Sequence, residues 1–148
     1  MQLPISHERP NIMHIDLNSA FATTEQQAHP SLRGRPVAVT NRLTKGACVI
    51  ACSYEGKAKG IKVGMRFDEA KLLAPNLVMV ETDPPKYHYV YQKLASIMKS
   101  YSPNVKMKSI DEGIIDFHGT RGVVNPRPLS VIGYEIKKRV QTEIGDWM

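Results

Sequence analysis

The sequence predicts an α+β fold, in which an antiparallel sheet is backed by helices and a small basic subdomain is inserted. Alternating apolar residues predict short strands near both ends of the chain, at residues 12–17 and 105–117. Apolar stripes with helical spacing predict long helices at 83–101 and 129–144. A basic stretch rich in turn-forming residues, 35–76, separates the first strand from the later elements.

Composition and charge bound the function. With 148 residues, 42% of them hydrophobic, the chain can bury one core and a small subdomain. The formal charge of +6 indicates an anionic partner, because seven basic and only three acidic residues lie between Arg42 and Lys71. A solvated basic face without a partner is the alternative that charge alone leaves open.

The chain also indicates where the protein resides. It has no apolar run of ~18 residues and no secretory signal pattern, which predicts a cytoplasmic protein with no membrane partner. Residues 1–10 are interpreted as a mobile leader. Cys48 and Cys52 are predicted on a single strand, which places them about 13 Å apart. They cannot pair at that distance and are expected to be buried, reduced thiols.

The first strand leads directly into a helix. Asp16 ends this strand, and the helix begins at Asn18 or Ser19, both good N-cap residues, and runs to about Gln27. Its first turn presents unpaired backbone N–H groups, which bind phosphate readily. These groups belong to Ser19, Ala20 and Phe21.

The inserted stretch is predicted to contain a hairpin and two short helices. Residues 37–40 pair with 47–52, Ser53 caps the first helix, and the second spans 67–74. A further strand is predicted at 77–81.

The stretch 105–117 predicts an acidic hairpin. Period-2 spacing places Val105, Met107, Ile115 and Phe117 on the core face, and Glu112 and Asp116 on the opposite face with Lys106 and Lys108. Asp111 and Glu112, at the bend between the strands, are interpreted as metal ligands. An ordinary hairpin with an acidic turn is the alternative.

Two motifs together resemble those of the Y-family, translesion DNA polymerases: Ile15-Asp-Leu-Asn-Ser-Ala-Phe21 and, far downstream, Ser109-Ile-Asp-Glu112. Residues 30–39 and 53–65 also resemble that family, in the expected order. The resemblance implies a ferredoxin-like palm from residues 11–34 and 77–148, incomplete at its C-terminal end, and a fingers subdomain from 35–76. An N-terminal piece of a longer polymerase is therefore expected, with very little activity alone and one strand left as an open sheet edge.

The resemblance also implies roles for individual residues. Asp16, Asp111 and Glu112 would be catalytic and bind two Mg²⁺ ions, with the Leu17 carbonyl oxygen joining the metal shell. Ser19, Ala20 and Phe21 would hold the incoming nucleotide, with Phe21 as the steric gate that excludes a 2′-hydroxyl. The nucleotide phosphates would contact Tyr54 and Lys57, although Lys57 stands where the family usually has Arg and should bind phosphate more weakly.

Primer–template DNA and deoxynucleoside triphosphates are the partners that this resemblance implies, and it suggests a sliding clamp bound through C-terminal regions beyond this chain. Two other classes stay open. One is a non-catalytic relative that binds DNA or protein, and the other is a different two-metal nucleotidyl enzyme, such as a nucleotide cyclase. For Phe21 alone, a core aromatic residue at the start of a helix is the alternative to the gate.

Overall fold

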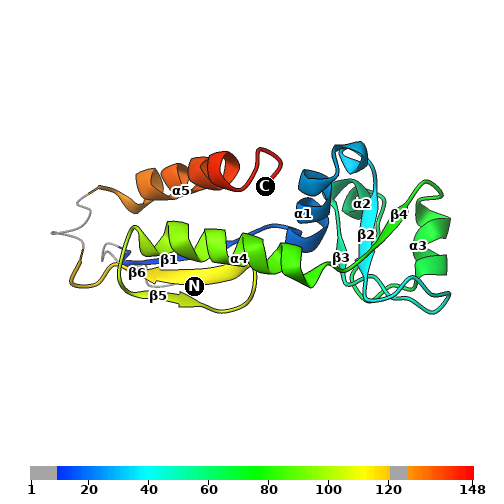
Figure 1. The fold of residues 1–148 in the computed structure, drawn as a ribbon, viewed down its shortest axis with the longest axis horizontal. Coiled ribbons are helices and arrows are strands. Elements are labelled where there is room, and N and C mark those ends of the chain that lie inside the picture. The colour runs from blue at the N-terminus through cyan, green and yellow to red at the C-terminus, as the bar shows by residue number, and fades with distance from the viewer. Residues whose placement is uncertain (1–9, 121–126) are drawn as a thin grey trace, which may run out of the picture.

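The computed structural model describes residues 10–120 and 127–148. Residues 1–9, which are nearly all of the predicted leader, and residues 121–126 lie outside the described residues. The molecule is elongated, with a larger sheet and its helices at one end and a smaller sheet at the other (Figure 1). We call these the large unit and the small unit. None of the described helices is both long and apolar enough to cross a bilayer.

The large unit is built on a three-stranded antiparallel sheet. Its strands are β1 (Ile12–Asp16), β6 (Glu112–Asp116) and β5 (Val105–Met107), in that order. The register pairs Ile12 with Asp116 and Asp16 with Glu112, so strands far apart in sequence lie side by side. The predicted acidic hairpin is confirmed, and β1 forms one edge of this sheet.

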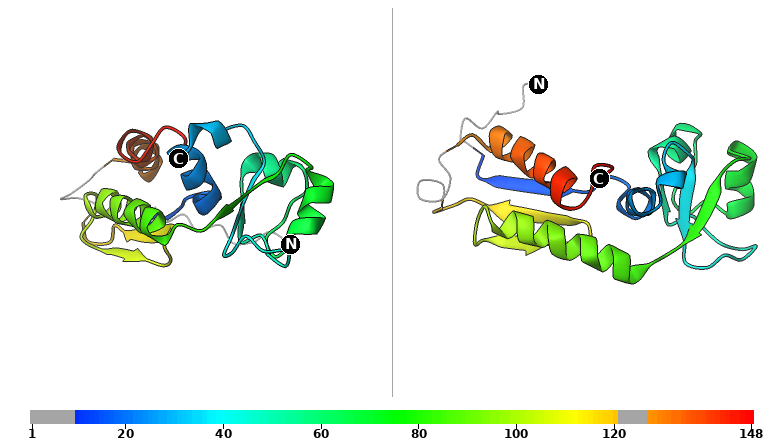
Figure 2. Two further views of the ribbon diagram at one scale, coloured as in Figure 1. Left: turned by 45° about the vertical axis from the view of Figure 1, so that its right-hand side comes forward. Right: turned by 45° about the horizontal axis from the view of Figure 1, so that its top comes forward.

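Two long helices, α4 (Pro84–Lys99) and α5 (Leu129–Glu143), cover one face of this sheet (Figures 1 and 2). The Asp83 side chain caps α4 by accepting a hydrogen bond from the Lys86 amide. The predicted apolar stripes of both helices pack on the sheet, where Ile115 and Phe117 are fully buried. This arrangement confirms the α+β fold with a helix-backed antiparallel sheet.

No helix of the described residues lies over the opposite face of the sheet, which carries the polar side chains. Along β1 the exposure alternates, with His14 and Asp16 exposed and Met13 and Ile15 partly buried against the core. This is the face on which the sequence analysis placed the acidic residues.

A single helix connects the two units. Helix α1 (Ala20–Ala28) follows β1, and a 3-10 turn, η1 (Pro30–Leu32), leads into the small unit. Figure 2 shows α1 between the large sheet and the small unit. In the small unit, α2 (Tyr54–Ala58) and α3 (Phe67–Leu73) pack with a sheet of β3 (Ala51–Cys52), β2 (Val37–Thr40) and β4 (Val78–Glu81). The predicted hairpin and both short helices are therefore present.

Strand β4 lies in a different place from the one expected. Residues 77–148 were expected to lie in the palm with the first strand, but β4 pairs in parallel with β2 of the small unit. The reason is connectivity: the chain from β2 passes through α2 and α3 before it returns, so β4 completes the small sheet beside β2. The chain re-enters the large unit only at α4.

Both cysteines are free thiols, as expected, but only Cys52 has the expected burial. Cys52 is buried, and this burial raises the pKa of its thiol. Cys48 is exposed, because it lies outside β3 and forms only an isolated bridge with Arg66. The two residues therefore do not share one strand.

Close packing in the small unit gives a stability prediction. Gly56, in α2, is buried against β3, and an alanine Cβ at this position would overlap Sγ of Cys52. We expect Gly56→Ala to lower the free energy of unfolding by about 1–3 kcal/mol in urea denaturation, despite the helix propensity of alanine. Gly46→Ala is the control, because its Cβ would meet open space. Equal stability of the two variants would contradict the packing argument.

Candidate active site

The predicted acidic residues come together where β1 and β6 pair. Asp16, the last residue of β1, lies opposite Glu112, the first residue of β6. One position further, the N–H of Leu17 donates to the carbonyl oxygen of Asp111 at 3.0 Å. Ordinary antiparallel pairing therefore places three acidic residues beside one another at the solvent-facing end of the sheet.

Two of these carboxylates have other partners in this structure. Asp111 Oδ1 accepts a hydrogen bond from Ser109 Oγ at 2.6 Å, and Glu112 Oε2 lies 3.0 Å from His14 Nε2. Across residues 10–120 and 127–148, no three acidic, His or Cys side chains are already gathered around one point that would hold a metal ion. The backbone thus brings the predicted ligands together, and the side chains must rotate to converge.

These residues fit Mg²⁺ by chemistry. Mg²⁺ prefers hard oxygen ligands, which the three carboxylates and the Leu17 carbonyl would supply. Rotation of the side chains is feasible because Asp16 is exposed and the Asp111 and Glu112 residues are only partly buried. Asp111 and Glu112 would each exchange one hydrogen bond at the surface for a metal bond.

The turn from β1 into α1 has an unusual conformation at Ser19. This residue has φ of 54°, in the left-handed region, and its Oγ is buried without a hydrogen-bond partner among the described residues. Ser19 is the N-cap of α1, as predicted, but its side chain makes no capping hydrogen bond. The Thr23 hydroxyl instead donates to the carbonyl oxygens of Asn18 and Ser19. An orphaned hydroxyl beside the open first turn of a helix suits an anionic ligand.

Phe21 lies in the first turn of α1, next to the acidic residues. Its ring is only partly buried and stacks on the ring of Tyr87 from α4, with centroids 4.3 Å apart and planes at 14°. Ala20, Phe21 and Asp111 line the same small cleft. The structure therefore places the predicted gate beside a predicted metal ligand.

The small unit contributes Tyr54 and Lys57 from α2. Both side chains are exposed, and the Lys57 ammonium lies 5.8 Å from the centre of the Tyr54 ring. Gln26 of α1 donates a hydrogen bond to Glu55 Oε2 of α2 at 3.1 Å, and this bond links α2 to α1. Although partial burial opposes the effect, hydrogen bonds from its own amide, Ser53 and Gln26 lower the pKa of Glu55.

A cavity of about 480 Å³ lies along β1 and reaches the candidate site. Asp16, Leu17 and Tyr54 are among the residues that line it, which brings residues of both units to one space. Lys137 of α5 also lines this cavity, and the sequence analysis assigned it no role. The sequence could have indicated this position, because Lys137 directly follows the buried Ile136 and so lies at the margin of the apolar face of α5.

Acidic residues on neighbouring strands of a helix-backed antiparallel sheet, next to the start of a helix, define a polymerase-like palm. Solved structures share this fold. The crystal structure of DinB from Sulfolobus solfataricus matches with a TM-score of 0.80 and 21% identity, over 89% of this chain and 38% of that one. A structure described as a Dbh ternary complex matches with a TM-score of 0.77 and 22% identity, over 88% of this chain and 38% of that one.

The chain belongs to the impB/mucB/samB family, whose model matches residues 15–147. Two curated relatives are both named DNA polymerase IV. The one from Bacillus velezensis is 35% identical over 90% of this chain and 31% of its own length. The one from Moorella thermoacetica is 38% identical over 91% of this chain and 34% of its own length. The chain thus spans about a third of the curated relatives it matches, and the predicted resemblance to Y-family polymerases is confirmed.

Proposed function

We propose that this chain supplies the palm and fingers of a translesion DNA polymerase, which adds deoxynucleotides to a primer 3′-hydroxyl on a DNA template. The observation that carries the proposal is the pairing of Asp16 with Glu112, beside Asp111, at the start of α1. The names of the relatives support the activity. In this proposal the large unit is the palm, and residues 35–76 form the fingers together with β4.

Asp16, Asp111, Glu112 and the Leu17 carbonyl would hold two Mg²⁺ ions. When bound, such ions neutralise charge on the attacking and leaving oxygens of an in-line displacement. The other residues bind and orient the nucleotide. The N–H groups of Ser19, Ala20 and Phe21 face the triphosphate, and Tyr54 and Lys57 contact it from the fingers.

The small unit distinguishes a polymerase from a cyclase on a similar palm. It carries seven exposed basic residues: Arg35, Arg42, Lys45, Lys57, Lys59, Lys62 and Arg66. Such a surface suits the phosphates of DNA, since phosphate contacts dominate affinity for nucleic acid. Binding of a sliding clamp stays a prediction that no described residue tests.

Primer extension tests this proposal. We define the fusion polymerase as residues 1–148 of this chain followed by the remaining residues of the Bacillus velezensis relative. We expect it to extend a primer on a DNA template in the presence of Mg²⁺, and to copy past a damaged template base. A folded fusion polymerase that extends no primer would contradict the proposed function.

The gate assignment gives a separate prediction. In the fusion polymerase, Phe21→Ala removes the ring that would lie under the sugar, so ribonucleotide incorporation should rise by about 10- to 100-fold relative to deoxyribonucleotide incorporation. Steady-state kcat/KM for matched ribo- and deoxyribonucleotides measures the ratio. An unchanged ratio in a folded variant would instead favour Phe21 as a core aromatic residue.

A further inference from the structure

We propose that Tyr87 is a positioning residue for sugar discrimination, because its ring supports the Phe21 ring and is itself held by the buried carboxylate of Glu25. The inference rests on the proposed function, in which Phe21 is the gate. It gives Tyr87 a role in supporting the gate residue, which neither the sequence motifs nor the names of the relatives indicate.

The first observation is the contact between the two rings. Phe21 stacks nearly parallel on Tyr87, whose ring is buried with 4% of the residue exposed. Phe21, Tyr87 and Asp111 all line one small cleft. A gate ring can exclude a hydroxyl only if it cannot tilt away, and Tyr87 occupies the space into which it would tilt.

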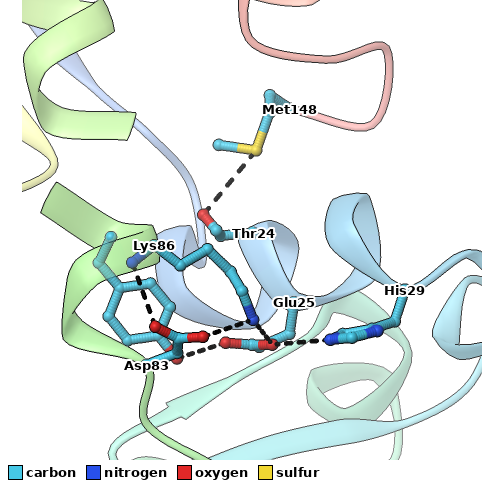
Figure 3. Close-up of polar contacts among 7 residues, drawn as sticks. Thr24, Glu25, His29, Asp83, Lys86 and Met148 are labelled. Atoms are coloured by element: carbon cyan, nitrogen blue, oxygen red, sulfur yellow. Dashed lines mark hydrogen bonds and ion pairs between the residues drawn. The ribbon is translucent and has the colours of Figure 1, made fainter. Parts of the chain in front are cut away.

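The second observation is the anchor behind Tyr87. Its hydroxyl donates to Glu25 Oε1 at 2.8 Å, and Lys86 Nζ donates to Glu25 Oε2 at 2.6 Å. Glu25 is 1% exposed, and its carboxylate points at the start of α4 (Figure 3). Asp83 also pairs with Lys86 at 3.3 Å, and His29 lies 3.9 Å from Glu25. Both carboxylate oxygens are therefore engaged.

The protonation states suit a fixed anchor. Burial, together with the hydrogen bond to Glu25, raises the pKa of Tyr87, so the phenol keeps the proton that it donates. Although desolvation opposes it, the hydrogen bond to Glu25 raises the pKa of Lys86. The anchor consequently consists of a neutral donor and a cationic donor on one carboxylate.

Helical geometry connects the anchor to the gate. Phe21 and Glu25 are four residues apart on α1, so they lie on the same face of that helix. Lys86 and Tyr87 are neighbours in the first turn of α4. Helices α1 and α4 are thus held together by two neighbouring noncovalent contacts, the stacked rings and the hydrogen bonds to Glu25. Movement of Tyr87 would break a buried hydrogen bond to a charged group, which is among the stronger kinds.

The decisive variant is Tyr87→Phe, which keeps the ring and removes only the anchoring hydroxyl. In the fusion polymerase we expect it to lower the preference for deoxyribonucleotides by about 3- to 10-fold, as measured by kcat/KM for matched nucleotides. Tyr89→Phe is the matched control, because Tyr89 lies on the same helix and is exposed. A Tyr87→Phe variant with the same ratio as Tyr89→Phe would overturn the proposal.

A double variant separates this inference from the gate itself. If Tyr87 acts through Phe21, then Phe21→Ala/Tyr87→Phe should discriminate no less than Phe21→Ala alone. If Phe21→Ala has no effect, the gate assignment in the proposed function fails. If Phe21→Ala relaxes discrimination and Tyr87→Phe does not, only the present inference fails.

A measurement on the 148-residue chain gives a readout independent of activity. Ring-flip rates of Phe21, measured by NMR, should rise in Tyr87→Phe and Glu25→Gln and stay unchanged in Tyr89→Phe. Circular dichroism establishes that each variant is folded. Unchanged flip rates in both anchor variants would contradict the anchoring role, whatever the kinetics show.

Discussion

Replacing Asp111 by Asn is expected to reduce primer extension by the fusion polymerase about 10³-fold or more. The substitution keeps the size of the side chain and removes the negative charge that would hold the metal ions. Such a loss corresponds to ~4 kcal/mol of transition-state stabilisation, which is the scale of a removed electrostatic contact at a reacting centre. Single-turnover extension of a labelled primer at saturating nucleotide measures it.

Stability should hardly change in this variant. The Asp111 side chain is only partly buried, and its partner Ser109 is exposed, so an amide can replace the carboxylate in that hydrogen bond. Asp116→Asn is the matched control, since Asp116 is also a partly buried aspartate and lies at the far end of β6. Its partner is His118, which lowers the pKa of the Asp116 carboxyl. Equal loss of extension in both variants would show that overall charge, rather than the site, matters.

Much of the large unit could be predicted from the sequence because its elements obey simple periodicities. Alternation in 12–17 and 105–117 predicted which side chains face the core, and the structure buries Ile115 and Phe117 accordingly. The start of α4 could also be predicted, because Asp83 is a good capping residue and two prolines follow it. The site followed from these strands, since pairing of β1 with β6 alone places Asp16 opposite Glu112.

The remaining features depend on tertiary contacts that local patterns do not encode. A short strand such as β4 has no local signal for its partner, and its parallel pairing with β2 depends on how the intervening chain folds. The left-handed Ser19 and the orientation of the carboxylates are also set by their surroundings.

Helix α1 shows most clearly that local sequence patterns do not predict tertiary burial. Its polar residues Glu25 and Gln26 would ordinarily be assigned to solvent, yet each is only 1% exposed. They are buried because α1 lies between the two units. Glu25 bonds to α4 of the large unit, and Gln26 bonds to Glu55 of the small unit. The sequence could not predict this, since burial on both sides of a helix leaves no amphipathic pattern.

The buried position of Glu25 gives the largest stability prediction. We expect Glu25→Ala to lower the free energy of unfolding by about 3–5 kcal/mol, because the buried hydroxyl of Tyr87 would lose its acceptor and the ammonium of Lys86 would keep only its pair with Asp83. The control is Glu143→Ala, which removes a pair of the same kind with Arg139 at the surface. That change should cost only about 0.3–0.5 kcal/mol, as is usual for exposed pairs on a helix.

Replacing both Glu25 and Lys86 tests whether the loss of stability comes from leaving one charge without its partner. Replacing Glu25 by Leu and Lys86 by Met leaves no uncompensated charge, so the double variant should be destabilised by less than the sum of the two single changes. Urea unfolding of the 148-residue chain, followed by circular dichroism, measures each free energy. Additive effects, or a Glu25→Ala cost no larger than that of Glu143→Ala, would mean that water reaches the Glu25 carboxylate and that it does not fix α1 against α4.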